Sequence, residues 1–576
     1  MPLDQAMATS ESRSRDPITE SERITRCWRH NHSFSLIILA LLALLLIGDN
    51  MVDAAPFPPP DLTKCGMAYN STEICCILPT SLSGKPIKKF EIQHAHLPLR
   101  FRRAAHLLDD AFIEKYQKAM ELMRALPDND GRSWNAQWRL HCAYCNNHLY
   151  YPDHEFPLEI HQSWLFLPWH RLFLFFHERI LAKLIGDDNF ALPFWNWDNQ
   201  NNTEPFPNAL PWAYYNNVSL SPTALNKTSS LWDPDRNPCS KPPRLVEFQT
   251  FIPCLPRPFP DLTRIQNAHM MWTQMVSAGA TPLLMAGGEY RFGDFGGRGM
   301  GAVEGRPHSP MHAWTNVRDM GTFRAAASDP AFYGLHGNLD RLWELWKTLP
   351  GKYRGEVADP DYQNSEFTYY DEDGEQISAT IKDFLDLKKI RVQYEEVSNA
   401  WVDKGTPQLN GDPAWLFCAS DPSETGVARI IRKAPRFKAP MYVVKGPLTF
   451  KVKRRPNLNE NHGEEMLELK VANFTWHKQH TINLFAYLPV AQYENTSIGC
   501  HEYLGTLQNF PHPGASPDMN YEMVYRVGIR RKLENMGRAH LKQLVITLVG
   551  QSYASPTSPG ESGMNITSAK VIYSKL

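Results

Sequence analysis

The chain has 576 residues, of which 43% are hydrophobic, so it is long enough for two or three domains with sizeable cores. Its 60 basic and 61 acidic side chains give a formal net charge of −1. This balance gives no support for nucleic acid or an anionic membrane surface as a partner.

The N-terminal 54 residues resemble a targeting segment. The apolar run FSLIILALLALLLI occupies positions 34–47, arginines precede it, and VDAA at 52–55 supplies small residues for cleavage. A run of 14 apolar residues is short for a membrane span, which needs about 20, but suits the core of a signal peptide. Acidic residues ahead of the run argue against a plastid transit peptide. We therefore predict a signal peptide over 1–54, with an uncleaved signal anchor as the alternative.

Seven N-x-S/T sequons follow this segment, at Asn70, Asn201, Asn217, Asn226, Asn473, Asn495 and Asn565. Behind a signal peptide they indicate a glycoprotein of the secretory pathway, in the vacuole lumen or outside the cell. That compartment is oxidising, so the cysteines are expected to form disulfides. Removal of Cys27 with the signal peptide leaves nine cysteines, so at least one is free, bound to metal or linked to a group other than cysteine.

Helical periodicity dominates from about residue 105 to residue 350. The segment 108–126 is amphipathic, whereas 163–185 and 335–349 are apolar nearly all round and are expected to be buried. The stretch 286–305 holds eight glycines, but it follows no strand pattern and lacks the spacing of a phosphate-binding loop. We therefore predict an irregular loop there.

After about residue 440 the hydrophobic period changes to two, which is typical of strands in an antiparallel sandwich. The expected strands are 441–454, 464–476, 481–490, 541–550 and 569–576. Just before them, 429–440 carries five basic residues and two prolines and is expected to be exposed to proteases. The predicted organisation is a mainly α domain over 55–402, a protease-sensitive linker over 403–440 and an all-β sandwich over 441–576.

The stretch HQSWLFLPWHRLFLFFHERIL at 161–181 places three histidines in an apolar, aromatic run. On one continuous helix His170 and His177 lie on the same side but roughly 10 Å apart, too far for one metal ion. Pro168 favours a helix start, so His161 is expected to precede the helix and His170 to lie in its first turn, where the two can converge. For each histidine alone, a hydrogen-bonded place in the core is the competing explanation.

A second group of histidines begins in EGRPHSPMHAW, at 304–314. His308 and His312 are four residues apart, a spacing that presents two nitrogens on one helix face. A zinc-protease motif would need Glu directly after the first histidine, where Ser309 stands. His336 is the third member of this group.

Asp340 lies one helical turn after His336. We predict that its carboxylate accepts the free ring N–H of His336 and fixes the tautomer. A salt bridge with a nearby arginine such as Arg341 is the alternative.

Two histidine triads result: His141, His161 and His170, and His308, His312 and His336. Six neutral imidazoles without a carboxylate suit copper, and zinc less exclusively. Two three-coordinate ions side by side would leave positions open for O2, and each copper can change its oxidation state by one electron.

Five motifs, in this order, resemble the copper-binding regions of plant polyphenol oxidases, the catechol oxidases and tyrosinases of the type-3 copper group: HCAYC, HQSWLFLPWHR, LPFWNWD, PHSPMHAW and DPAFYGLHGNLDRLW. The C-terminal half resembles the shielding domain of that family, and 365–377 is similar to the segment that closes its catalytic domain. The resemblance implies a four-helix bundle that holds two copper ions, copper A on the first triad and copper B on the second. It also implies oxidation of o-diphenols to o-quinones with reduction of O2 to water, in a latent proenzyme that a protease activates within 403–440.

The resemblance implies covalent links as well. In the family the last cysteine of HCxxC forms a thioether with the second copper-A histidine, which would join Cys145 to His161. The implied disulfides are Cys65–Cys76 and Cys75–Cys142, and we add Cys239–Cys254 from proximity in the sequence alone. Taken by itself, Cys142-x-x-Cys145 is also compatible with a redox or zinc pair.

Four further positions match functional positions of the family. Glu304 matches an acidic residue proposed to hold an active-site water, and Phe323 matches the aromatic gate over copper A. Ser309 and Ala313 occupy positions thought to control the choice of substrate. Many members have Asn or Gly in place of Ser309, and serine is a poorer polariser of water, which argues against monophenol hydroxylation. Leu335 replaces a second histidine but precedes the ligand, so metal binding is expected to persist.

Two functions from other classes compete with this prediction. A hemocyanin-like oxygen carrier would use the same six histidines and bind O2 without turnover. A two-zinc hydrolase would need carboxylate ligands or a bridging acid, and neither triad contains one.

Overall fold

The computed structural model describes residues 54–62, 75, 86–92, 96–146, 158, 160–201, 203–204, 206–220, 227–248, 260–294, 299–403, 422–443, 447–456, 458–472, 480–489, 498–509, 522–552 and 564–575. Residues 55–576 form one compact unit. The predicted signal peptide lies outside the described residues except for Ala54, as do Cys65, Cys76 and Cys254. Within the described ranges no helix is both long and apolar enough to cross a membrane.

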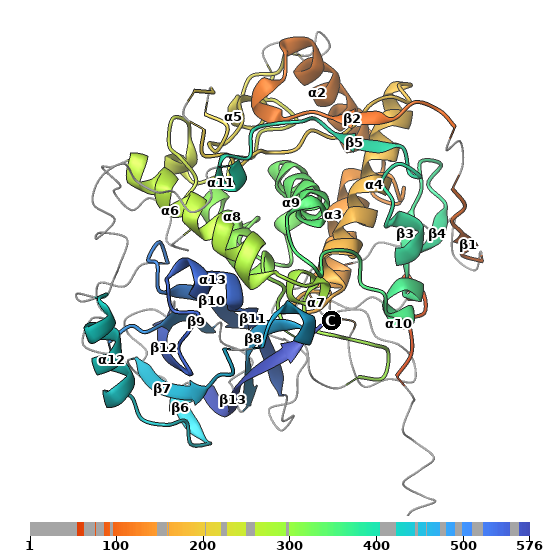
Figure 1. Cartoon of the computed structure of the whole chain (residues 1–576). Coiled ribbons are helices and arrows are strands. Elements are labelled where there is room, and N and C mark those ends of the chain that lie inside the picture. Colours follow the sequence, from red (N-terminus) through yellow and green to blue (C-terminus); the bar gives the residue numbers. More distant parts are fainter. Residues whose placement is uncertain are drawn as a thin grey trace, which may run out of the picture. The chain divides into compact units, whose positions relative to one another are not determined.

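Long helices build the first part of this unit (Figure 1). They are α2 (Asp110–Ala125), α3 (Trp134–Cys145), α4 (Phe166–Ile185), α6 (Pro260–Trp272) and α9 (Ala331–Thr348). The predictions of helices at 108–126, 163–185 and 335–349 are therefore confirmed to within a few residues.

The ends of these helices follow from local chemistry. The side chain of Asp109 accepts a hydrogen bond from the backbone N–H of Phe112, and that of Ser133 accepts one from Ala136, so each satisfies a free donor of a first helical turn. Helix α4 ends at Gly186, whose φ of 65° is left-handed and suits glycine.

Shorter helical elements connect the long helices. These are η3 (Ala105–Leu107), α5 (Trp212–Tyr215), η5 (Pro238–Ser240), the π-helical η6 (Thr273–Ala278) and η7 (Glu304–His308), α7 (Pro282–Ala286), α8 (Ser309–Thr315), η8 (Ala326–Ser328), α10 (Pro360–Asn364), η9 (Ile381–Phe384) and α11 (Ala400–Asp403). The predicted glycine-rich loop at 286–305 begins with Ala286, the last residue of α7, and ends within η7. Among its described residues it holds isolated β-bridges but no long helix or strand.

Two small sheets border the helices. Strands β1 (Lys88–Lys89), β4 (Gln376–Thr380) and β3 (Glu366–Tyr370) form one in that order, and β2 (Arg100–Arg102) pairs in parallel with β5 (Val392–Tyr394) in the other. Arg100 and Arg102 of β2 reach the carboxylate of Glu178 on α4 at 3.1 and 2.8 Å, which ties this sheet to the helices through a buried ion pair.

The C-terminal part is a sandwich of two four-stranded antiparallel sheets (Figure 1). One sheet has the order β10-β9-β12-β7 and the other β11-β8-β13-β6. The strands are β6 (Met441–Val443), β7 (Leu448–Lys453), β8 (Glu464–Ala472), β9 (His480–Ala486), β10 (Tyr503–Asn509), β11 (Met523–Gly528), β12 (Gln543–Ser552) and β13 (Met564–Ser574), with the helices η11 (Glu460–His462) and α13 (Arg530–Asn535). The predicted mainly α part followed by a β-sandwich is confirmed.

Three details of the C-terminal half differ from the sequence prediction. The expected strand 441–454 is two strands, β6 and β7, which belong to different sheets, and β10 and β11 were missed. Within the expected linker, 424–433 forms helix α12 (Glu424–Lys433), capped by the side chain of Ser423, whereas 404–421 lie outside the described residues.

Candidate metal centre

The six histidines of the two predicted triads come from five helical elements and one adjoining turn. They are His141 on α3, His170 on α4, His312 on α8, His336 on α9, His161 in the turn before α4 and His308 at the end of η7. His161 precedes α4 as predicted, and His170 is the fifth residue of that helix, just beyond its first turn.

In space these residues form two adjoining clusters. The candidate ligand atoms of the first cluster, from His141, Cys145, His161 and His170, lie within 4.8 Å of one another, as do those of the second, from His308, His312 and His336. The clusters touch, because the rings of His170 and His336 stack with centroids 4.1 Å apart and those of His161 and His308 lie 6.0 Å apart. The structure therefore brings together all six histidines that the sequence singled out.

Burial favours the neutral form of five of these imidazoles. It lowers the pKa of His141, His170, His308 and His336 well below the usual value, and neighbouring imidazoles lower it further. Burial also lowers the pKa of His312, to about 4. A neutral imidazole has a lone pair to offer, which is the form that binds a metal ion.

Hydrogen bonds orient the rings of three histidines toward the centre. The Nδ1 atoms of His170, His308 and His312 lie 2.8, 3.1 and 2.7 Å from the backbone oxygens of Phe166, Glu304 and Met320. Each Nδ1 must donate to its carbonyl oxygen, so each Nε2 carries the lone pair.

This tautomer assignment tests whether a metal fits the second cluster. The Nε2 atoms of His308 and His312 are only 2.8 Å apart, and two lone pairs at that distance repel unless a cation lies between them. Both ring nitrogens of the buried His336 lack a hydrogen-bond partner within the described part of the chain. A metal ion would satisfy the facing Nε2 atoms of His308 and His312 and one ring nitrogen of His336, and donors that are all imidazole suit copper.

Glu304 connects the two clusters. Its carboxylate oxygen Oε1 lies 3.1 Å from Nδ1 of His161 and accepts a hydrogen bond from the backbone N–H of Gln162 at 2.8 Å. Its backbone oxygen is the partner of His308. The family resemblance implies a water-holding role for Glu304, and the contact with the His161 ring has no signal in the local sequence.

Aromatic rings enclose the histidines. The ring of Phe323 meets His161 edge to face with centroids 4.8 Å apart, which places the predicted gate beside the first cluster. Phe166 and Phe332 were not predicted. The ring of Phe166 lies 4.8 Å from both His170 and His308. A helical spacing of four residues between Phe166 and His170 was the available sequence signal.

The two predicted specificity positions lie on α8 beside His308 and His312. The hydroxyl of Ser309 donates a hydrogen bond to the backbone oxygen of Glu304 at 3.0 Å, so it is turned back along the helix. Ala313 is partly exposed on the same helix.

One of the covalent links implied by the resemblance is present among the described residues. The structure contains a disulfide between Cys75 and Cys142, with Cα atoms 5.1 Å apart. Cys145 is buried and belongs to the first cluster, within reach of His161. Cys239 is disulfide-bonded, but the partner suggested for it, Cys254, lies outside the described residues.

The prediction for Asp340 is wrong. Its carboxylate accepts hydrogen bonds from Arg102 at 3.2 Å, Arg171 at 2.5 Å and the Tyr394 hydroxyl at 2.6 Å. A buried carboxylate is stabilised more by two guanidinium groups than by one neutral imidazole, so it turns away from His336. The alternative of an arginine salt bridge holds, although the partners are not Arg341.

His177 is a core residue, as its distance from the other histidines suggested. Its Nδ1 lies 3.3 Å from the side-chain oxygen of Gln137, and its ring stacks on Tyr333 with centroids 3.8 Å apart. Burial lowers its pKa to about 3.

Three family models match the chain in sequence order. The common central domain of tyrosinase matches residues 131–349, the polyphenol oxidase middle domain matches 356–406, and the chloroplastic polyphenol oxidase C-terminal domain matches 442–560. The first match contains both histidine clusters, and the last contains most of the sandwich.

Curated proteins and solved structures agree with these matches. A chloroplastic polyphenol oxidase of Vitis vinifera is 34% identical over 516 residues, which is 86% of this chain and 80% of that protein. Aureusidin synthase of Antirrhinum majus is 36% identical over 69% of this chain and 71% of its own length. The structure of latent apple tyrosinase covers 85% of this chain and 100% of its own with a TM-score of 0.70 and 30% identity.

The prediction of a vacuolar or extracellular location is wrong. Relatives from Vitis vinifera, Vicia faba, Malus domestica and Prunus armeniaca are named chloroplastic, which points to the plastid. The prediction rested on an apolar run behind arginines and on sequons, but targeting signals are addresses read by receptors. The length of the apolar run at 34–47 and the charges before it are therefore not sufficient to identify the compartment to which the protein is sent.

Helical core, β-sandwich and adjoining histidine clusters agree with the family matches and with relatives that span most of the chain. The clusters suit a binuclear copper centre. The chain belongs to the plant polyphenol oxidases, a family of type-3 copper oxidoreductases.

Proposed function

We propose that the protein oxidises o-diphenols to o-quinones while O2 is reduced to water. The observation that carries this proposal is the contact between two clusters of three imidazoles, joined by the stacked rings of His170 and His336 at 4.1 Å. His141, His161 and His170 would hold one copper ion, and His308, His312 and His336 the other. When bound, the copper pair supplies two one-electron redox centres next to each other.

The remaining residues of the site orient the substrate and the ligands. The ring of Phe323 restricts the approach to His161, and a flat phenol ring can pack against these two rings. Glu304 holds the ring of His161 and is proposed to accept a proton from the phenol, directly or through a water. A thioether between Cys145 and His161 would fix the same ring further.

The hydroxyl of Ser309 bears on the choice of substrate. Because it donates to the backbone oxygen of Glu304, it is engaged and poorly placed to polarise a water. This favours diphenol oxidation over monophenol hydroxylation. Two relatives show that the family is not uniform, since one is named aureusidin synthase and another, 31% identical, is named (+)-larreatricin hydroxylase.

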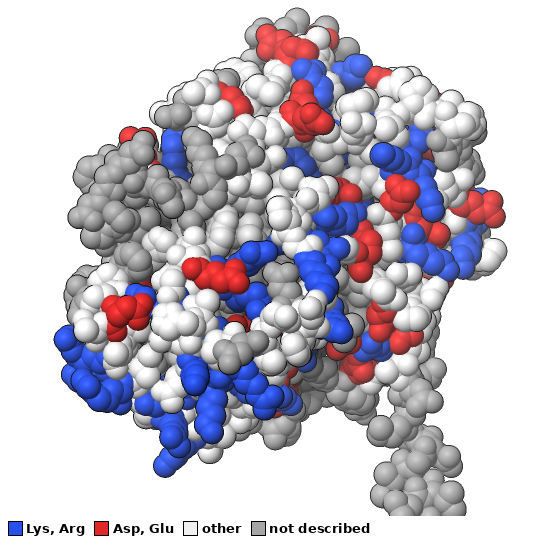
Figure 2. Space-filling model, viewed as in Figure 1, with Lys and Arg blue, Asp and Glu red and all other residues white. Residues whose placement is uncertain are grey.

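We also propose that the enzyme is made latent and that cleavage within 403–440 activates it. Strand β10 of the sandwich packs against η7, since a Cβ on Gly305 would lie 3.7 Å from the backbone oxygen of Thr506. Basic residues of 429–440 are exposed, and Figure 2 shows blue side chains gathered over α12 and its neighbours. The structure of latent apple tyrosinase matches 85% of this chain.

Oxygen uptake tests both proposals. The copper-loaded protein is supplied with catechol or with a monophenol, before and after limited trypsin digestion. Uptake with catechol that rises after cleavage supports them together. Equal uptake with the monophenol would contradict the assignment based on Ser309, and uptake that cleavage leaves unchanged would contradict latency.

A further inference from the structure

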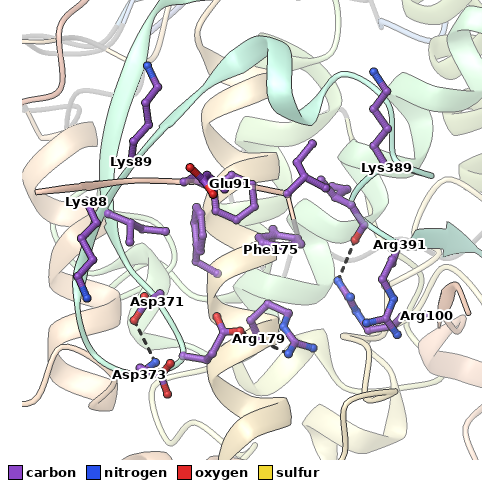
Figure 3. A pocket seen from close by; sticks show the side chains of 16 residues that line it. Lys88, Lys89, Glu91, Arg100, Phe175, Arg179, Asp371, Asp373, Lys389 and Arg391 are labelled. Atoms are coloured by element: carbon purple, nitrogen blue, oxygen red, sulfur yellow. Dashed lines mark hydrogen bonds and ion pairs between the residues drawn. The ribbon is translucent and has the colours of Figure 1, made fainter. Parts of the chain in front are cut away.

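A cavity of about 350 Å³ lies on the side of α4 that faces away from the histidine clusters (Figure 3). Arg179 lines it and follows His170 by nine residues, which at 100° per residue places it on the opposite face of the helix. The other walls come from β1, the turn between β3 and β4, and the turn at 389–391. The volume is in the range of small-molecule sites, roughly 300–1,000 Å³.

Three arginines form one end of this cavity. The guanidinium of Arg100 donates to the backbone oxygen of Ile390 at 3.2 Å, and that of Arg391 donates to the backbone oxygen of Pro98 at 2.9 Å. Figure 3 shows these two arginines side by side, with Arg179 at the same cavity. Backbone carbonyls hold the groups in place without neutralising them, since a carbonyl carries no net charge.

The charges at this end are incompletely compensated. Arg100 has the buried Glu178 at 3.1 Å, but Glu178 is shared with Arg102. Among the described residues, Arg179 pairs with the carboxylates of Asp188 and Glu372 at 3.4 and 3.5 Å, which are long for ion pairs. Burial lowers the pKa of Arg391 and the positive charge of Arg179 lowers it further, which the negative charge of Asp188 offsets only in part. An added anion would relieve this repulsion.

Arg391 is held in a strained backbone conformation. Its φ is 61°, in the left-handed region, which is unfavourable for a residue other than glycine. Its backbone N–H donates to the backbone oxygen of Lys388 at 3.1 Å, and its backbone oxygen accepts from the backbone N–H of Arg100 at 2.7 Å. These hydrogen bonds fix the conformation of the turn. Only 7% of Arg391 is exposed, which keeps its guanidinium at the cavity instead of in bulk water. Strain of this kind occurs preferentially at ligand sites.

Aromatic rings form the floor. Phe90, Phe175 and Phe176 line the cavity and pack edge to face on one another, with centroids between 5.2 and 5.8 Å apart. The Arg100 guanidinium lies 5.5 Å from the ring centroid of Phe175. An apolar ring can therefore contact the floor while its acidic group meets the arginines.

Three of the four acidic residues that line the cavity, Asp371, Glu372 and Asp373, have partners of their own, and the fourth, Glu91, is exposed. Asp371 accepts the backbone N–H groups of Asp373 and Glu375 at 3.0 and 2.9 Å within its turn, and Asp373 pairs with Lys183 at 3.3 Å. In Figure 3 Asp371 and Asp373 lie toward Lys88, away from Arg391.

We propose that this cavity binds a small organic anion that carries an apolar ring, with its acidic group on Arg179 and Arg391 and its ring against Phe175. The site is separate from the copper centre, so one molecule of protein can hold both a phenol and this anion. The proposal does not depend on the proposed activity.

Binding of naphthalene-2-sulfonate to the copper-loaded full chain tests the proposal by titration calorimetry. We expect saturation at one anion per chain, and weakening of about tenfold in Arg391→Gln and in Arg179→Gln, each of which removes a charge-assisted hydrogen bond. Arg318→Gln is the matched control, because its side chain is 75% exposed and pairs with Asp235 elsewhere. The neutral naphthalene-2-sulfonamide should bind much more weakly.

Testing Arg391→Gln and Arg179→Gln separately guards against a folding artefact in either one. The thermal midpoint and the rate of catechol oxidation of each variant are measured alongside binding. Arg100 is not substituted, because that would leave Glu178 buried with one partner fewer. No saturable binding by the wild-type chain would overturn the proposal. So would binding that Arg391→Gln and Arg179→Gln weaken no more than Arg318→Gln does.

Discussion

The carboxylate of Glu304 lies 3.1 Å from Nδ1 of His161, across 143 residues of sequence. Glu304 precedes His308 by one helical turn, and its backbone oxygen is the partner of that ring at 3.1 Å. One residue therefore orients a ligand of each histidine cluster. The positions of the two clusters are linked through it.

Glu304→Gln should lower copper occupancy of the first cluster and the rate of catechol oxidation by about 10- to 100-fold, because a neutral amide polarises the His161 ring less. The amide oxygen can still accept from Gln162, so the fold should persist. Copper per chain and oxidation rate are the measurements. Glu289→Gln, in a side chain that is 40% exposed, should change neither, and an equal effect of both variants would refute the role of Glu304.

His312→Ala should bind one copper ion less per chain than the wild type, because it removes a ligand of the second cluster. His177→Ala is the control, since this buried histidine packs against Tyr333 and belongs to neither cluster. Metal analysis of both purified variants is decisive. Loss of copper in His177→Ala, or full copper in His312→Ala, would show that the ligands are assigned wrongly.

Asp340→Asn should lower the free energy of unfolding by about 3–5 kcal/mol, because it leaves two buried guanidinium groups short of a negative charge. Denaturant unfolding measures the change. The exposed Asp386→Asn, in a turn where the carboxylate accepts the Lys388 N–H, should stay within about 0.5 kcal/mol of the wild type. Equal stabilities of the two variants would mean that the arginine network contributes little.

Lys532 makes stability depend on pH. The amine is fully buried where α13 of the sandwich meets α6 and η6, 2.9 Å from the His269 ring and 3.1 Å from the Thr273 hydroxyl. Burial lowers its pKa from 10.5 to about 7. Between these values the unfolded chain binds a proton that the folded chain does not, so unfolding is favoured increasingly as the pH falls toward 7.

The thermal midpoint should therefore rise from pH 7 to pH 9.5, and Lys532→Met should flatten this rise. Below pH 7 the amine is charged in both states and contributes no further slope. Calorimetric scans of both chains across this range compare the slopes. Parallel curves for the wild type and Lys532→Met would contradict the shifted pKa.

Much of the site could be predicted because its signals are local. Pro168 and the spacing of His308 and His312 report helix geometry directly, and an all-imidazole donor set restricts the metal. Helices such as α4 have a strong apolar period, so their bounds were predicted closely.

Contacts between distant segments could not be predicted in the same way. Asp340 has partners on β2 and α4 that are 238 and 169 residues away, and no local pattern reports their distance. The run 441–454 has one continuous period of two, although β6 and β7 join different sheets. Sheet membership depends on pairing partners, which alternation alone does not encode.

We propose that copper ions held by the two histidine clusters transfer electrons from a diphenol to O2. Quinone absorbance and oxygen concentration, followed together in the copper-loaded protein supplied with catechol, measure this transfer. We predict two quinone molecules for each O2 consumed, because each diphenol gives up two electrons and O2 accepts four. Oxygen that binds reversibly while catechol stays unchanged would contradict the claim and would indicate an oxygen carrier.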